Sequence, residues 1–170
     1  AIAPKGCLLH APDMYMQKIC VGPRAKGRID IRASVTENLK NVADAMGREV
    51  SDLTMVILDR ERHEKIIREA REAGARVYLI TDGDVVPSAD CGIQGSGIHM
   101  VMGSGGAPEG VITAAAVRTL GGDMQGRLRP MSPEEIERCH QMGFKTDEEI
   151  GRLLNLDDLV SGKDILFAAT

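Results

Sequence analysis

Three short polar segments carry the residue types best suited to bind a phosphorylated ligand or a cation. They lie at residues 59–63, 82–84 and 103–110. Each follows an apolar run with the composition of a buried strand. Ligands of open α/β sheets bind beyond the carboxyl ends of strands. We therefore expect the three segments to meet at one edge of a sheet.

The first segment contains two arginines, Arg60 and Arg62, on either side of Glu61. Two guanidinium groups at the start of a helix can hold a phosphate through paired hydrogen bonds. The positive end of the helix dipole would add to their field. The alternative is a solvated helical turn whose arginines pair with Asp59 and Glu64.

The second segment is Asp82, Gly83 and Asp84. Two carboxylates beside a glycine can accept hydrogen bonds from sugar hydroxyl groups or approach a divalent cation. Asp-Gly is also a common turn dipeptide, so a purely structural turn is an equal alternative.

The third segment is rich in glycine, and its four glycines allow backbone N–H groups to approach a ligand. Pro108 suits the first turn of a helix, and Glu109 follows it. A carboxylate there can hold a hard cation while nearby N–H groups face a phosphate. Pro108 stands where a dinucleotide-binding fingerprint needs its third glycine, and no Gly-Lys-Ser/Thr follows as in a P-loop. The alternative is a tight strand-to-helix turn.

The elements that must position these segments alternate along the chain, which predicts an α/β fold with a mostly parallel sheet. The apolar patterns predict strands at 54–58, 76–80 and 98–102, and further short strands at 7–10, 18–21 and 165–170. They predict helices near 36–46, 61–73, 108–120 and 133–142, with Thr36 as the N-cap of the first. A break near residue 50 suggests two domains, 1–50 and 51–170.

Composition narrows the class of protein. The 170 residues carry a formal net charge of −4 and 2% aromatic residues, so we expect no nucleic-acid partner. No apolar run reaches the length of a membrane span, and no membrane partner is expected. The four cysteines form no C-x-x-C pair, and we expect reduced thiols in a cytoplasmic protein. The four histidines lack metal-ligand spacing and are expected to be structural or exposed.

Six motifs in order resemble the class II fructose-1,6-bisphosphatases. Gly-Gly-Ala-Pro-Glu-Gly at 105–110 is the most specific of them, and the order and spacing match along nearly the whole chain. Some cyanobacterial members of the family also act on sedoheptulose 1,7-bisphosphate. The other motifs lie at 11–16, 21–23, 82–84, 121–126 and 167–170.

The resemblance implies a layered sugar-phosphatase fold of the inositol-monophosphatase-like superfamily. It also implies Mg²⁺ or Mn²⁺ as cofactor, with a metal-activated water that releases the 1-phosphate of fructose 1,6-bisphosphate, in gluconeogenesis or the Calvin cycle. It implies a homo-oligomer with a small sugar bisphosphate as its ligand. Glu109 matches the family's catalytic glutamate and metal ligand. The matching substrate-contact positions are Tyr15, Arg60, Glu61, Arg62, Asp82, Gly83, Asp84 and Gly106. The family often has a proline where this chain has Glu61.

The family's other metal ligands lie in an N-terminal acidic stretch that includes an Asp-Pro-Leu-Glu-Gly-Thr-like motif, which has no counterpart here. We therefore expect this chain to be part of a longer enzyme, and expect the isolated 170-residue polypeptide to be inactive. One alternative is a non-catalytic α/β domain that binds a sugar phosphate or a nucleotide. A second alternative is a nicotinamide-dependent oxidoreductase. The incomplete glycine fingerprint argues against it.

Overall fold

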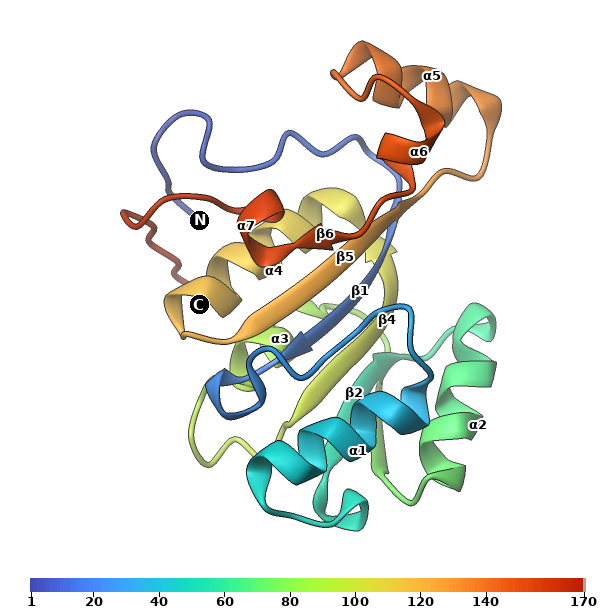
Figure 1. Cartoon of the computed structure of the whole chain (residues 1–170), viewed down its shortest axis with the longest axis vertical. Helices are drawn as coiled ribbons and strands as arrows, with labels where there is room; N and C mark the ends of the chain where they lie inside the picture. The colour runs from blue at the N-terminus through green and yellow to red at the C-terminus, as the bar shows by residue number, and fades with distance from the viewer. Residues whose placement is uncertain (170) are drawn as a thin grey trace.

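The computed structural model describes residues 1–169, which form a six-stranded sheet with helices on both faces (Figure 1). The strand order is β3-β2-β4-β1-β5-β6, so the first strand lies near the middle of the sheet. The strands are β1 (Tyr15–Val21), β2 (Thr54–Leu58), β3 (Arg76–Ile80), β4 (Met100–Gly106), β5 (Asp123–Arg129) and β6 (Leu154–Asn155).

The sheet is mixed, and the prediction of a mostly parallel sheet was wrong. β2 is parallel to β3 and β4, whereas β1 is antiparallel to both β4 and β5, and β6 is antiparallel to β5. A strand–helix–strand pattern predicts only that the two strands of each unit run in the same direction. It does not reveal that β1 inserts in the reverse direction between the two strands joined by α4 (Ala107–Thr119).

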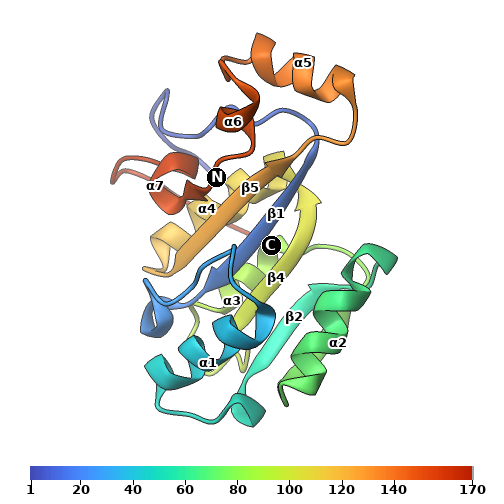
Figure 2. The same cartoon turned by 45° about the vertical axis from the view of Figure 1, so that its right-hand side comes forward.

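Two helices, α1 (Val35–Met46) and α2 (Glu64–Glu72), cover one face of the sheet (Figure 2). α1 is capped at Ser34, whose side chain accepts a hydrogen bond from the Glu37 N–H, and not at Thr36 as predicted. Gly47 ends the helix with a φ of 64°, a left-handed conformation that glycine adopts readily. The apolar stripe of α1 packs on Ile19, Met55 and other buried residues of β1, β2 and β4.

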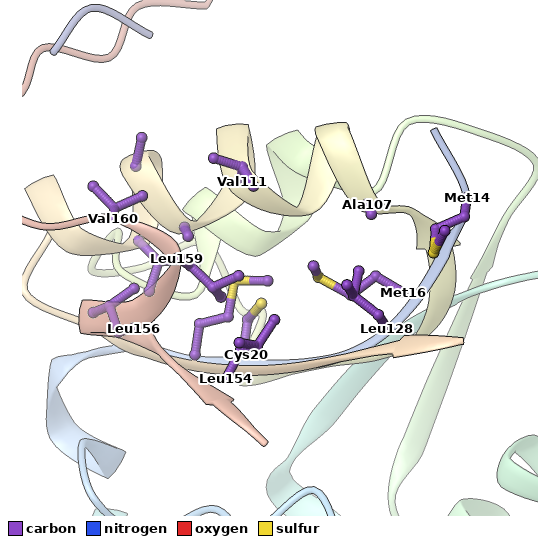
Figure 3. Packing of buried hydrophobic residues seen from close by; sticks show 14 of the residues in the cluster. Met14, Met16, Cys20, Ala107, Val111, Leu128, Leu154, Leu156, Leu159 and Val160 are labelled. Carbon is purple, nitrogen blue, oxygen red and sulfur yellow. The ribbon is translucent and has the colours of Figure 1, made fainter. Parts of the chain in front are cut away.

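The helices α3 (Val85–Asp90), α4 and α7 (Leu156–Leu159) lie on the opposite face. Figure 3 shows Met16, Cys20 and Leu128 of the sheet facing Ala107 and Val111 of α4. The run of small residues at 114–116 is fully buried, so α4 can lie close to the strands.

α5 (Pro133–Gln141) and α6 (Asp147–Ile150) lie beyond the end of β5 (Figure 1). Ser132 caps α5 by accepting from the Glu135 N–H, and Pro133 occupies the first turn. The described residues also form three short 3-10 helices: η1 (Pro23–Ala25), η2 (Val50–Asp52) and η3 (Glu61–His63).

The predicted terminal strands are wrong for the described residues. Segment 7–10 contributes only an isolated bridge from Leu8 to Val160, and segment 165–169 only one from Leu166 to Ile2. Leu166 is 57% exposed, while Leu8 and Ile165 pack on the core as irregular segments. Apolar composition indicated burial here, but no neighbouring strand is available to pair with. Residue 170 lies outside the described part, as does that end of the 165–170 prediction.

Two further findings bear on the class of protein. Within residues 1–169, no helix has the length and apolar character needed to span a bilayer. All four cysteines are free thiols. The predicted division into domains 1–50 and 51–170 stays a prediction.

Candidate functional site

A groove of about 690 Å³ lies where β2, β3 and β4 end and where β1 begins. All the predicted site residues except Glu61 line this groove, and Glu61 is exposed outside it. The sequence patterns did not predict that Glu135 and Arg138 of α5 close one side of the groove. The full lining is Asp13, Met14, Tyr15, Leu58, Arg60, Arg62, Asp82, Gly83, Asp84, Val85, Gly105, Gly106, Glu109, Glu135 and Arg138.

The two arginines bridge β2 to its neighbours on either side. Arg60 donates from Nη2 to the Thr81 carbonyl oxygen at 2.7 Å, beyond the end of β3. Arg62 donates from Nη2 to the Ser104 carbonyl oxygen of β4 at 2.9 Å. Within residues 1–169 neither guanidinium group forms an ion pair, so the predicted alternative of pairing with Asp59 and Glu64 is not what the structure shows. Their positive charge is therefore available to an anion in the groove.

Tyr15 begins β1 beside this pair. The Arg62 guanidinium carbon lies 4.8 Å from the centroid of the Tyr15 ring, a cation–π arrangement. Tyr15 stays 42% exposed. Its ring helps to orient Arg62 while leaving the phenol accessible from the groove.

His63 fixes the loop that carries the arginines. Its Nε2 accepts a hydrogen bond from the Ser104 N–H at 2.8 Å, so its Nδ1 carries the proton and donates to the Leu58 carbonyl oxygen at 2.8 Å. Burial lowers the pKa of His63, with Arg62 and Arg60 acting in the same direction. The neutral ring thus joins η3 to β4, and the prediction of a structural role fits its position.

The segment of two aspartates forms a turn that also presents its carboxylates. Gly83 has a φ of 79°, which favours glycine, and its N–H donates to Asp82 Oδ1 at 2.8 Å. Asp82 is exposed, whereas Asp84 faces inward at the start of α3. The two alternatives of a turn and a ligand-facing pair are therefore compatible.

A buried lysine that the sequence analysis missed lies beneath this turn. Lys18 of β1 is 1% exposed, and its Nζ is 2.7 Å from Asp84 Oδ2. The contact is an ion pair without good hydrogen-bond geometry, and no other partner reaches Nζ within residues 1–169. One sign of this buried lysine is present in the sequence: Lys18 is a charged residue followed directly by the apolar residues of a predicted strand.

The glycine-rich segment is not an open loop. β4 continues to Gly106, paired with β1, and α4 begins at the next residue, where the Ala107 N–H donates to the Met14 carbonyl oxygen at 2.8 Å. This is the strand-to-helix turn that was the alternative to a phosphate cradle. A Cβ on Gly106 would lie 1.9 Å from Glu109 Oε2, so this glycine makes room for the carboxylate.

Glu109 lies exposed in the first turn of α4, next to the groove. Within residues 1–169, no three His, Cys, Asp or Glu side chains converge as a metal site. Asp84, the groove's inward-facing carboxylate, is paired with Lys18. Glu109 thus has no converging pair of further ligands among the described residues, which do not fit a two-metal centre by themselves.

The fold and the groove define an α/β protein with an anion-compatible site at the end of its sheet. The sequence model of the family described as bacterial fructose-1,6-bisphosphatase, glpX-encoded, matches residues 1–170, and the chain belongs to this family. The resemblance found in the motifs is thus confirmed.

Curated relatives agree with this family. The chain is 48% identical to a protein of Synechococcus sp. (strain JA-2-3B'a(2-13)) named D-fructose 1,6-bisphosphatase class 2/sedoheptulose 1,7-bisphosphatase, over 100% of this chain and 52% of that protein. It is 43% identical to fructose-1,6-bisphosphatase 1 class 2 of Escherichia coli (strain K12), over 100% of this chain and 53% of the relative. The chain spans about half the length of the curated relatives it matches.

Proposed function

We propose that this chain supplies the substrate-binding groove of a class 2 fructose-1,6-bisphosphatase. The reaction is hydrolysis of the 1-phosphate of fructose 1,6-bisphosphate, with sedoheptulose 1,7-bisphosphate as a second substrate. The observation that carries the proposal is the meeting of the arginine pair, the two aspartates and Glu109 around one groove in a chain of this family. The names of the relatives from Synechococcus and E. coli support the same activity.

The charges in the groove suggest how a sugar bisphosphate would lie. Arg60 and Arg62 have N–H groups free of carboxylate partners, so they hold the phosphate remote from the reaction, with Tyr15 as a further donor. Asp82 and Asp84 would repel a phosphate, and they accept hydrogen bonds from the sugar hydroxyl groups instead. This arrangement orients the opposite end of the sugar toward Glu109.

The proposal includes Mg²⁺ or Mn²⁺ as cofactor, with Glu109 as one ligand. A bound divalent cation supplies charge stabilisation and an activated water in reactions of this kind. The residues described here do not complete such a centre, and we derive no reaction step through it. The inositol-monophosphatase-like superfamily and a homo-oligomeric assembly belong to the same proposal.

Calorimetric titration with fructose 1,6-bisphosphate tests the groove directly. We expect saturable binding by this chain, weakened in an Arg60→Gln variant and unchanged in the matched variant Arg71→Gln at the exposed end of α2. Affinity that rises with Mg²⁺ or Mn²⁺ supports the enzyme. Equal affinity with and without the cation would favour the alternative of a non-catalytic sugar-phosphate-binding or nucleotide-binding domain.

Phosphate release tests the catalytic part of the proposal. In a full-length protein that carries this segment, Glu109→Gln should lower the rate of release by about 100-fold or more. The fold should be unaffected, because the side chain is exposed. Activity that survives this change would show that Glu109 is not a required ligand. The isolated 170-residue chain is expected to release no phosphate.

A further inference from the structure

A second groove lies at the opposite end of the sheet from the candidate site. It has a volume of about 800 Å³ and is formed by η1, the end of α1 and the glycine-rich segment 91–98, which leads to His99. His99 precedes β4 and bonds to Thr54 at the start of β2, so this groove adjoins the amino ends of both strands.

Two arginine side chains give the lining of this groove a positive charge, and no lining carboxylate offsets it. Arg24, Arg48 and His99 line it, and no aspartate or glutamate is among its lining residues. Burial lowers the pKa of His99, and Arg48, Arg76 and Arg24 add to this effect against Asp52 alone. The local field therefore favours an anion.

The hydrogen bonds of His99 show that an acceptor is missing. The Thr54 N–H donates to Nδ1 at 2.9 Å, and Arg48 Nη1 lies 2.9 Å from Nε2. Both neighbours are donors, but an imidazole ring always carries at least one N–H of its own. Because a backbone N–H can only donate, Nδ1 is the acceptor for Thr54 and Nε2 carries the proton. Arg48 and His99 thus direct two N–H groups at one another.

We propose that this groove binds the phosphoryl group of a small phosphorylated compound or of inorganic phosphate, with one oxygen that accepts from both Arg48 and His99 Nε2. A phosphate oxygen accepts both N–H groups at once and neutralises the surrounding arginines. The remaining lining is partly apolar, with Ile93 50% exposed, and gives room for the body of an ester.

The second groove is separate from the candidate active site. Seven residues of β4, from Met100 to Gly106, run between the two ends of the sheet, a distance of roughly 20 Å at about 3.3 Å per residue. One sugar bisphosphate cannot reach both. The inference therefore does not depend on the proposed phosphatase activity.

Nuclear magnetic resonance of the ¹⁵N-labelled chain tests this site. Inorganic phosphate and fructose 6-phosphate are titrated in parallel, while the Thr54 amide and the His99 ring nitrogens are observed. An Arg62→Gln background weakens binding in the first groove. We expect saturable shifts at Thr54 and His99, with a hydrogen-bonded Nε2–H signal that appears on binding.

Variants decide the result. Arg48→Gln should weaken the binding seen at His99 by about tenfold or more, Arg48→Lys should retain part of it, and the matched surface variant Arg71→Gln should leave it unchanged. Tighter binding of fructose 6-phosphate than of inorganic phosphate identifies an ester as the ligand, and the reverse identifies the free ion. The absence of saturable shifts with both probes, or equal binding by folded Arg48→Gln, would overturn the proposal.

Discussion

Lys18 Nζ lies 2.7 Å from Asp84 Oδ2, with the lysine side chain 2% and the aspartate side chain 12% exposed. The pair joins the central strand β1 to the turn that presents Asp82 and Asp84. It also lies against Gly105, where an added Cβ would be 3.0 Å from Asp84 Oδ2 and 3.3 Å from Lys18 Nζ. The position of the aspartate turn therefore depends on a residue outside the groove.

Replacing Lys18 with methionine should leave the Asp84 carboxylate, which is only 12% exposed, without a counter-charge. We expect a loss of roughly 3 kcal/mol in the free energy of unfolding, measured by urea denaturation. The double variant Lys18→Met/Asp84→Asn should be more stable than Lys18→Met alone, because no unpaired charge remains. Lys40→Met, at an exposed position of α1, is the control and should change stability little. Equal stability of Lys18→Met and Lys40→Met would contradict this account.

Replacing Arg62 with lysine should weaken binding while keeping the charge. The guanidinium donates to the Ser104 carbonyl oxygen through Nη2 and Nε and lies over the Tyr15 ring, and an ammonium group cannot keep this geometry. We expect the dissociation constant for fructose 1,6-bisphosphate to rise by about tenfold, as measured by calorimetry. Arg68→Lys, on the exposed surface of α2, should bind like the parent chain. If charge alone mattered, Arg62→Lys would also bind normally.

Gly106→Ala should separate site geometry from stability. The added Cβ would meet the far end of the Glu109 side chain, which is exposed and can move aside, so stability should fall by no more than about 1 kcal/mol. The carboxylate would nevertheless leave its position over Gly106. In a full-length protein, we expect this variant to lose phosphate release nearly as fully as Glu109→Gln while its melting temperature stays close to that of the parent. A fully active Gly106→Ala protein would show that this position of Glu109 is unimportant.

His63 should make stability depend on pH. Burial lowers the pKa of His63 in the folded state. Near and below about pH 6.5, this histidine is therefore protonated more fully in the unfolded chain than in the folded chain. Stability should therefore fall as the pH drops from about 7 to 5. Protonation would also oppose the Ser104 N–H bond to Nε2.

The His63→Gln variant isolates this contribution, because its amide can both accept from Ser104 and donate to Leu58 without titrating. Urea denaturation at several pH values should give a shallower loss of stability for His63→Gln than for the parent. The exposed His10 serves as the control when changed to glutamine. An identical slope in the parent and His63→Gln would rule out this role for His63.

Much of the groove could be predicted because strand ends are visible in the sequence. Arg60, Asp82 and Gly106 come at the ends of three apolar runs, and parallel neighbours bring such ends to one edge. Lys18 could not be predicted as a partner of Asp84, since its pairing depends on where β1 enters the sheet. That placement is a long-range property, and local patterns of apolar residues carry no information on it. The roles of the groove residues in binding and catalysis remain predictions.

The place of β1 also determines the order in which the chain can fold. β2, α2 and β3 are consecutive and can associate as a local unit. Tyr15 of β1 instead pairs with Gly106 and Arg129, which are about 90 and more than 110 residues further along the chain. Closing such long loops is slow because their entropy is lost before the contacts form. During synthesis β1 is therefore made well before β4 and β5, the strands between which it pairs. For that interval, a chaperone or a competing strand has access to a segment whose residues are mostly buried in the native protein.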